Sequence, residues 1–431
     1  MRVVMGVSLV DGWVPPVLLG VGAAALFWLL VRWSRGALVT LVLALLLSAL
    51  TFLGLNPLVL RVLDLVPDPL PERVLVWISV GVFGLVLAVG GLIHTRAWRK
   101  VLSVACGIVV LAAAGSQVNV YFQQYPTLGA LLSADDPVDS GALAGGRGAA
   151  SKPMPTPVVQ RWKGKVTGTS SMATAPIPGT VSGLTARPAQ IYLPAVYDSP
   201  NPPLLPVLVL VAGQPGGPDD WVTAGQLQPL MDGVAAAHGG LAPVTVVVDP
   251  NGADANDTMC MDSDIAKADT YLSKDVPAWI AANLGIDSNK AHWAFGGWSY
   301  GGTCALEMAT RHPDLYPSFI DMAGELEPAV SADRAQTVQA AFGGDTAAFD
   351  AQVPMTLLAR HRYPQVWGYF SNGSEEPQVG QWMTTQAAAA RQAGMTVQTQ
   401  VVPGQGHSWG VPHASLPPAL DFLGQRLGIR R

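Results

Sequence analysis

The strongest constraint on the fold is a series of four long apolar runs before residue 120. Each run has about the 20 residues that a helix needs to cross the hydrocarbon core of a bilayer. The runs cover residues 13–31, 37–55, 74–93 and 101–118. They predict a four-helix transmembrane region over residues 1–120, with three spans as the alternative because the last run is short and rich in Ala. A signal peptide is a weaker interpretation of the first run, since three more runs follow it.

The charged residues between the runs predict the orientation of this region. Loops 32–36 and 94–100 carry basic residues and no acidic ones, which is typical of the cytoplasmic side, while loop 56–73 is balanced in sign. The N-terminus and everything beyond residue 120 are then extracytoplasmic, and the protein is expected in the cell membrane. Because no run contains a charged residue, we interpret the region as an anchor in the lipid bilayer and not as a conduction path. The basic residues concerned are Arg32, Arg35, Arg96, Arg99 and Lys100.

Composition excludes several other classes of protein. A net charge of -5 argues against nucleic acid as a partner, because binding phosphates needs a basic face. Half of the residues are hydrophobic, so the bulk of the chain cannot be disordered. Three cysteines are too few for a disulfide-rich scaffold or a cysteine-rich metal site.

The chain changes character twice after the apolar runs. Residues 121–178 are rich in Pro, Gly, Ala, Ser and Thr without any apolar period, which predicts a linker. Residues 179–431 alternate short β-branched runs with helix-like stretches, which predicts an α/β domain with a largely parallel sheet flanked by helices. The expected strands cover residues 190–193, 207–211, 244–248, 293–296, 318–322, 366–371 and 397–402. The expected helices cover residues 227–237, 274–283, 302–311, 376–393 and 417–427.

A nucleophilic serine is predicted within the sequence Gly297-Trp298-Ser299-Tyr300-Gly301. The G-x-S-x-G pattern alone is weak in a chain with 46 Gly, but here an apolar strand runs into it and a helix-like stretch leaves it. A strand–turn–helix of this kind holds the serine in a strained, exposed conformation. The alternative is a tight turn with a solvent-exposed serine.

A serine nucleophile needs a base and an acid that orients the base. Among seven histidines, His407 is favoured because it lies in a glycine-rich loop between the last strand and the last helix, and His413 is the runner-up. The acid is expected after the penultimate strand, where Glu375 and Glu376 follow an Asn-Gly-Ser turn; Glu375 is favoured and Glu376 is the alternative. The order serine, acid, histidine is that of the α/β-hydrolase fold.

Two backbone N–H groups are needed to bind the oxyanion of an acyl-transfer reaction. Tyr300 follows the nucleophile and can donate the first. The second is expected from the glycine-rich loop after the strand at 207–211, where Pro215 has no N–H and Gln214 is the best candidate. A plain glycine turn is the alternative for this loop.

The chain from about residue 180 to 428 resembles the esterase D and secreted mycolyltransferase (antigen 85 type) family of α/β hydrolases. The resemblance is carried by Ala212-Gly213-Gln214 followed by Asp219-Asp220-Trp221, the Gly297–Gly301 motif, Asn372-Gly373 before the acid, and His407-Ser408-Trp409. It implies a Glu as the acid, an oxyanion N–H at Gln214, and action outside the membrane on acyl esters, whose acyl groups pass between sugar lipids or to water. The chain departs from the mycolyltransferases at Ala212 and Pro215, where those enzymes have an Asp and an Arg that help hold trehalose.

The cysteines predict one disulfide, and the spacing of the polar residues predicts no metal and no cofactor. Cys260 and Cys304 both fall in the outer domain, where oxidising conditions favour a disulfide between them; two free buried thiols are the alternative. No group of His, Cys or Asp has metal-ligand spacing, and no phosphate-binding glycine loop opens a helix, so neither a metal nor a cofactor is expected.

These patterns predict a membrane-anchored extracytoplasmic serine esterase or acyltransferase that acts on envelope lipids or sugar esters. Two alternatives come from other classes of protein. One is a catalytically silent α/β-hydrolase fold used as a binding or scaffold module. The other is a membrane protein whose helices do the work while the outer domain regulates them.

Overall fold

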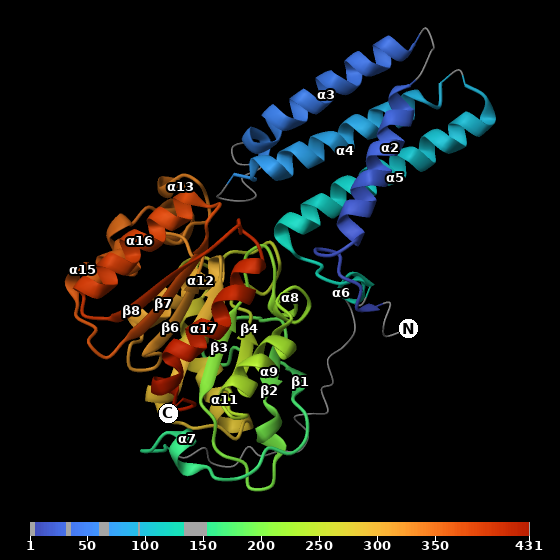
Figure 1. Ribbon diagram of the computed structural model, residues 1–431. Coiled ribbons are helices and arrows are strands. Elements are labelled where there is room, and N and C mark those ends of the chain that lie inside the picture. Colours follow the sequence, from blue (N-terminus) through green and yellow to red (C-terminus); the bar gives the residue numbers. More distant parts are fainter. Residues whose placement is uncertain (1–4, 32–35, 60–68, 94, 133–152, 431) are drawn as a thin grey trace. The chain divides into compact units, whose positions relative to one another are not determined.

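The computed structural model describes residues 5–31, 36–59, 69–93, 95–132 and 153–430 (Figure 1). The chain divides into two compact units, Met1–Ala134 and Asp135–Arg431. Several residues on which the expected orientation and linker depend lie outside the described part. These are Arg32, Arg35, residues 60–68 of the expected outer loop and residues 133–152 of the expected linker.

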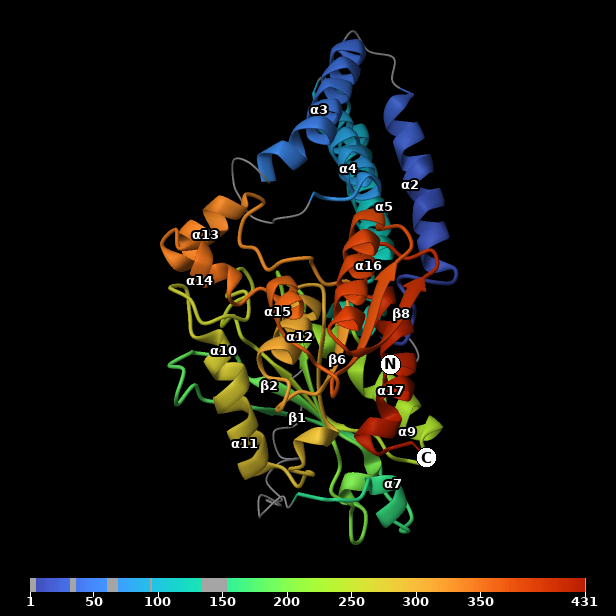
Figure 2. The ribbon, with the colours of Figure 1, turned by 90° about the vertical axis from the view of Figure 1, so that its left-hand side faces the viewer.

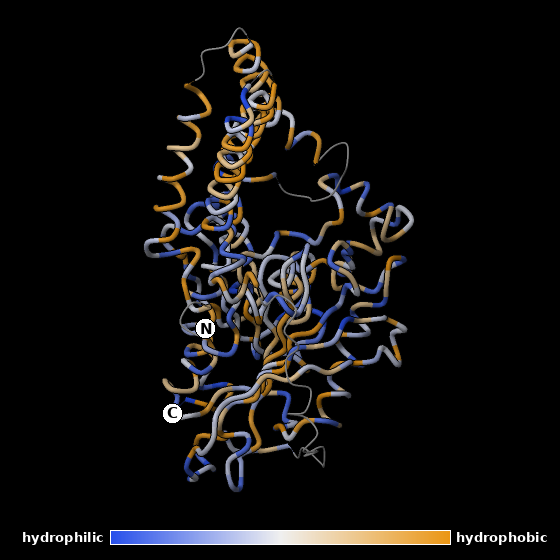
Figure 3. Tube along the Cα trace, turned by 90° about the vertical axis from the view of Figure 1, so that its right-hand side faces the viewer, coloured by the Kyte–Doolittle hydropathy of each residue, from blue (hydrophilic) through white to orange (hydrophobic). Residues whose placement is uncertain are grey.

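Among its described residues, the N-terminal unit contains four long apolar helices. They are α2 (Val14–Leu30), α3 (Ala37–Pro57), α4 (Glu72–Gly90) and α5 (Ala97–Phe122), and hydrophobic residues predominate along them in Figure 3. Helices α3, α4 and α5 are long and apolar enough to cross a membrane, whereas α2 has 17 residues. Three spans are therefore supported by length and composition, and the fourth stays a prediction. Helix α5 begins before and ends after the expected run because its flanking residues, including Arg and Lys, are compatible with a helix.

Small and polar side chains let these helices pack closely. A side chain on Gly22 of α2 would lie 2.5 Å from Cβ of Ala113 in α5. Ser48 Oγ of α3 donates a hydrogen bond to the carbonyl of Ser79 in α4, at 3.1 Å. Close approach at glycine and side-chain hydrogen bonds between helices are typical of packing inside a membrane. Helix α2 shares this packing despite its shorter length.

The C-terminal unit is built on one eight-stranded sheet in the order β1-β2-β4-β3-β5-β6-β7-β8 (Figure 1). Strand β2 runs antiparallel to both β1 and β4, and every other neighbouring pair is parallel. The strands are β1 (Ser171–Ala175), β2 (Ala189–Leu193), β3 (Val207–Val211), β4 (Val244–Val248), β5 (Trp293–Trp298), β6 (Ser318–Met322), β7 (Trp367–Gly373) and β8 (Thr396–Val402).

The expected linker is wrong at its C-terminal end, because β1 lies within it. Strand β1 has the sequence SMATA, whose small side chains give almost no apolar period. Its position is set by antiparallel pairing with β2, in which Ala173 lies opposite Ile191. This strand completes one edge of the sheet and belongs to the C-terminal unit.

Helices cover both faces of the sheet. Helices α9 and α17 pack against each other on one face, and α11, α12 and α15 lie on the other (Figure 2). Helix α16 packs against β7 and β8. Helices α8 and α13 to α15 are short and are not among the expected elements. The bounds are α8 (Pro218–Thr223), α9 (Leu227–Ala237), α11 (Val276–Asn283), α12 (Tyr300–Arg311), α13 (Arg334–Phe342), α14 (Thr346–Asp350), α15 (Pro354–Arg360), α16 (Pro377–Gln392) and α17 (Gly410–Leu427).

The parallel strands end at a common edge of the sheet. Val211 at the end of β3 pairs with Gly297 in β5, and Trp298 pairs with Met322 at the end of β6. The segments that follow β3, β5, β7 and β8 therefore leave the sheet side by side. In open α/β sheets this carboxyl edge is where ligands bind, and it carries every predicted catalytic residue.

Candidate active site

Ser299 lies on a sharp turn between β5 and α12. Its backbone has φ 56° and ψ -120°, a conformation that is strained for any residue other than glycine. The glycines on either side are required by space: a side chain on Gly297 would overlap the backbone of Gly301, and one on Gly301 would overlap the carbonyl of Val211. The Ser299 N–H donates to the carbonyl of Met322 at 2.8 Å, which ties the turn to β6. The chain thus presents the Ser299 hydroxyl at the carboxyl edge.

Three side chains form a continuous hydrogen-bonded line at this edge. His407 Nε2 lies 2.7 Å from Ser299 Oγ, and His407 Nδ1 lies 2.6 Å from Glu376 Oε1. The Glu376 side chain is only 10% exposed, so its contact with His407 is well shielded from water. The carboxylate at His407 is that of Glu376, and the preference for Glu375 is wrong in this geometry.

The backbone after β7 explains why Glu376 meets the imidazole. The Glu375 N–H donates to the carbonyl of Gln405 at 2.9 Å, so the chain here stays attached to the segment that carries His407. Glu375 lies in the turn after β7, and Glu376 is the residue directly before α16. The turn, the start of α16 and the contact between Glu375 and Gln405 together bring the Glu376 carboxylate to His407, and the sequence around residues 375 and 376 contains no signal for it.

Aromatic rings fix the plane of the His407 imidazole. The ring of Trp298 lies 4.3 Å from the imidazole, centroid to centroid, at an interplanar angle of 30°. Trp409 lies 6.1 Å from Trp298 and makes an edge contact with Trp221 at 5.3 Å. The sequence motifs contain Trp298 and Trp409 but give no reason to expect this stack. The runner-up histidine, His413, instead contacts the carbonyl of Ala224 at 2.9 Å, and burial lowers its pKa.

The two predicted oxyanion donors lie on segments next to Ser299. A side chain on Gly213 would come within 3.4 Å of Ser299 Cβ, so the loop after β3 passes directly beside the nucleophile. Gln214 follows Gly213 in that loop. Tyr300 is the first residue of α12, where backbone N–H groups have no acceptor within the helix and the helix dipole favours negative charge.

The phenol of Tyr300 connects α12 to the loop after β4. It donates to Asn251 Oδ1 at 2.9 Å and accepts from the Cys260 N–H at 3.2 Å. Burial, together with the charge of Asp257, raises the pKa of Tyr300. A disulfide joins Cys260 to Cys304 in α12, the pairing that the sequence predicts. The loop and the helix that carries the nucleophile are therefore held together twice.

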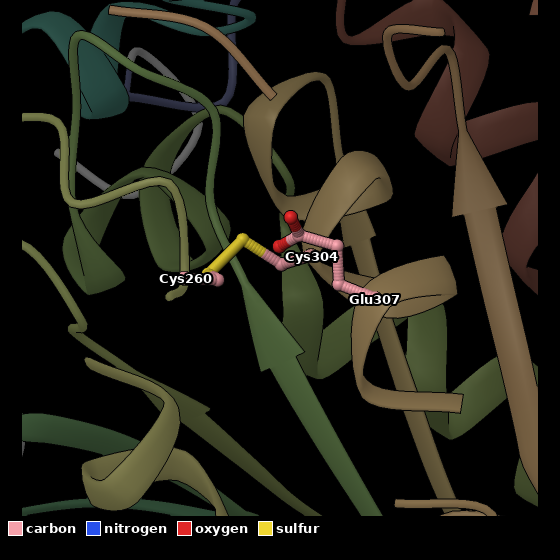
Figure 4. Close-up of side chains that lie close together, drawn as sticks. All are labelled: Cys260, Cys304 and Glu307. Carbon is pink, nitrogen blue, oxygen red and sulfur yellow. A yellow bond between two sulfur atoms is a disulfide. The ribbon is translucent and has the colours of Figure 1, made fainter. Parts of the chain in front are cut away.

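Glu307 lies beside this disulfide (Figure 4). Its side chain is fully buried, and neither carboxylate oxygen has a hydrogen-bond partner among the described residues. Burial raises the pKa of Glu307 to about 8, although Arg311 lies 3.7 Å away and opposes this. The two sulfur atoms and a Glu307 oxygen lie within 4.8 Å of one another. A metal would need thiolates here, and the disulfide ties up both sulfur atoms.

Comparisons of the sequence with known proteins show the family of this chain. The family model described as "Putative esterase" matches residues 185–421. An uncharacterized protein of Corynebacterium glutamicum is 33% identical over 375 residues, which cover 84% of each chain. That stretch is longer than the C-terminal unit and so includes part of the N-terminal unit. The MPT51/MPB51 antigen of Mycobacterium tuberculosis is 33% identical over 114 residues, which are 26% of this chain and 35% of that protein.

Two solved structures show the same fold at low sequence identity. A ferulic acid esterase is 18% identical, with a TM-score of 0.53 over 61% of this chain and 100% of that one. An S-formylglutathione hydrolase from Agrobacterium tumefaciens is 16% identical, with a TM-score of 0.50 over 62% of this chain and 98% of that one. The family model covers more than half of the chain, and the sheet, helices and turn around Ser299 are those of an α/β hydrolase. The chain belongs to the esterase family of α/β hydrolases.

Proposed function

We propose that this protein is a membrane-anchored serine esterase or acyltransferase that works through an acyl-enzyme on Ser299. The observation that carries the proposal is the unbroken line from Ser299 through His407 to Glu376, with contacts of 2.7 and 2.6 Å. A hydroxyl becomes a nucleophile when a base takes its proton, and this line supplies the base and the group that orients it.

The first half of the reaction transfers the acyl group to the enzyme. Ser299 Oγ attacks the carbonyl carbon of the ester while its proton passes to His407 Nε2. The N–H groups of Gln214 and Tyr300 stabilise the oxyanion that forms on the carbonyl oxygen. The intermediate then breaks its bond to the alcohol oxygen, and His407 returns the proton to the departing alcohol.

The second half of the reaction releases the acyl group. Water or a sugar hydroxyl gives its proton to His407 and attacks the acyl-enzyme carbonyl, and the bond to Ser299 Oγ breaks as the proton returns to that oxygen. Glu376 holds the Nδ1–H tautomer of His407, which leaves the Nε2 lone pair facing Ser299. The carboxylate also stabilises the imidazolium that forms in each half. Hydrolysis and transfer differ only in the hydroxyl that reaches the intermediate.

The expected setting is the outer surface of the cell membrane. Helices α3, α4 and α5 have the length and hydropathy of membrane spans. The basic residues Arg96, Arg99 and Lys100 at the start of α5 favour a cytoplasmic position for this end of the helix. With this end of α5 cytoplasmic, the single crossing by α5 places the C-terminal unit outside, whether or not α2 also spans the membrane. Acyl esters of envelope lipids or sugars are the substrates that such an anchored enzyme meets.

The deciding experiment is fluorophosphonate labelling of the detergent-solubilised full chain, together with turnover of a short acyl ester. Wild type should label and turn over, and Ser299→Ala should lose both. Ser288→Ala is the matched control, because Ser288 precedes β5 at the opposite edge of the sheet, and it should behave like wild type. Folded wild-type protein that neither labels nor turns over a panel of esters would favour the binding or scaffold module instead. Sugar acceptors added to the active enzyme then distinguish transfer from hydrolysis.

A further inference from the structure

The loop at residues 212–217, here called the oxyanion loop, is fixed on the C-terminal side of Gln214. The Gly217 N–H donates to Asp220 Oδ2 at 2.8 Å. The carbonyl of Gly216 accepts a hydrogen bond from Arg187 Nη2 at 2.8 Å, and the Gly216 N–H donates to the carbonyl of Asp254 at 3.2 Å. The oxyanion loop is therefore held by Arg187 and Asp254, which lie outside it, and by Asp220 of α8, the helix that follows it.

The Arg187 guanidinium joins three segments at this point. Its Nε donates to Asp249 Oδ2 at 2.8 Å and its Nη2 to Asp249 Oδ1 at 3.0 Å, a two-point contact with the carboxylate that follows β4. Its Nη1 pairs with the carboxylate of Asp254 in the next loop. Gly217 packs against the guanidinium so closely that a side chain there would lie 2.5 Å from Nη1. One rigid group therefore holds the end of β4, the loop after it and the oxyanion loop together.

We propose that Arg187 is a positioning residue that fixes the position of the Gln214 N–H relative to Ser299. The proposal rests on the proposed acyl-transfer function, because it assigns Arg187 a part in oxyanion stabilisation without contact to substrate. A guanidinium is planar and reaches carboxylate and carbonyl oxygens at fixed angles, whereas a lysine ammonium can occupy only one of these positions at a time. Lysine should therefore preserve the charge but not the geometry.

The role in positioning is separable from folding because Asp249 has other partners. The Asp249 side chain is only 2% exposed, so losing all of its partners would be costly. It also accepts hydrogen bonds from the backbone N–H groups of Arg187 at 2.8 Å, Asn251 at 3.0 Å and Gly252 at 3.0 Å. All three donors remain in Arg187→Met and Arg187→Lys, so Arg187→Met should still fold.

The test compares Arg187→Met and Arg187→Lys with wild type in the full-length solubilised enzyme. The matched control is Arg430→Met, because Arg430 pairs with Asp421 near the C-terminus and is half exposed. The measurements are kcat and KM for a short acyl ester, the fraction of protein that labels with fluorophosphonate, and the Ki of a trifluoromethyl ketone. The ketone forms a tetrahedral adduct with an active serine, and its oxygen occupies the oxyanion position.

Both Arg187 variants should lose about 10- to 100-fold in kcat, the range expected when an oxyanion donor is displaced but not removed. KM should change by less than about threefold, and Ki of the ketone should rise in parallel with the loss in kcat. Arg430→Met should match wild type. The proposal is overturned if Arg187→Met has the kcat and Ki of wild type. It is also overturned if activity falls only because a smaller fraction of the protein labels with fluorophosphonate, while Ki is unchanged. An inactive, unlabelled wild type would instead refute the proposed function itself.

Discussion

The substitution Glu376→Gln separates the two candidate acids, because Glu375 next to it provides a matched control. Glutamine keeps the shape of the side chain but removes the negative charge 2.6 Å from His407 Nδ1. If its amide group turns its N–H toward Nδ1, the imidazole carries its proton on Nε2 instead and can no longer accept the proton of Ser299. The variant thus loses both the correct tautomer and the charge that stabilises the imidazolium.

The expected magnitude follows from the burial of this contact. Neutralising the acid of a serine-protease triad lowers kcat by about 10⁴-fold. The Glu376 side chain is only 10% exposed, which favours a full effect, but the His407 side chain is 35% exposed and water can replace part of the lost interaction. We therefore expect kcat to fall by about 10³- to 10⁴-fold, or roughly 4–5.5 kcal/mol of transition-state stabilisation. KM should change little, because the acid acts on the base and does not contact substrate.

The assay is steady-state turnover of a short acyl ester by wild type, Glu376→Gln and Glu375→Gln at equal amounts of folded protein. The Glu375 variant keeps its backbone hydrogen bond to Gln405 and should stay within about threefold of wild type. The reasoning is refuted if Glu375→Gln loses activity while Glu376→Gln retains it. Similar small losses in both variants would mean that the carboxylate contact is not used in catalysis.

Three further predictions concern stability and topology. Because burial raises the pKa of Glu307 to about 8 from 4.5, the stability that its protonated form provides is complete below about pH 4.5 and is lost as pH rises through 8. The Tm of wild type should therefore fall relative to that of Glu307→Gln as the pH rises from 5 to 9. A constant difference between the two Tm values would contradict this. Replacing Cys260 and Cys304 together by Ala should lower the free energy of unfolding by about 4 kcal/mol, from the 44-residue separation, and should also reduce ester turnover; unchanged denaturant unfolding would contradict it. Alkaline phosphatase fused after residue 431 should be active in whole cells if the C-terminal unit is extracytoplasmic, whereas an inactive fusion that is stably expressed would reverse the assigned orientation.

The sequence predicts the centre of the sheet well because of how those strands are buried. Strands β3, β4 and β6 occupy the expected residues, since strands covered on both faces are short apolar runs between turn residues. The edge strand β1 could not be found this way, because its residues are small and its place depends on β2. Helices α13 to α15 are each too short for a helical period of apolar residues to be recognised in the sequence.

The residues that react and the residues that position them differ in how the sequence encodes them. The turn at Ser299 is encoded by its neighbours in the sequence, since only glycine fits at positions 297 and 301. The partner of His407 instead depends on how the turn after β7 and the start of α16 lie against the His407 loop, about 30 residues further along the chain, which is why Glu375 and Glu376 look equivalent in the sequence.

Arg187 is the extreme case of this difference. It pairs with Asp249, 62 residues further along the chain, and with Asp254, 67 residues along, and nothing near it in the sequence marks it as more than a surface charge. A pattern search therefore finds the nucleophile and the base of such a site while missing the group that holds the oxyanion loop. Because catalysis depends on donors placed to within a fraction of an ångström, those long-range contacts are where the substitutions that weaken activity without touching the reacting atoms should be found.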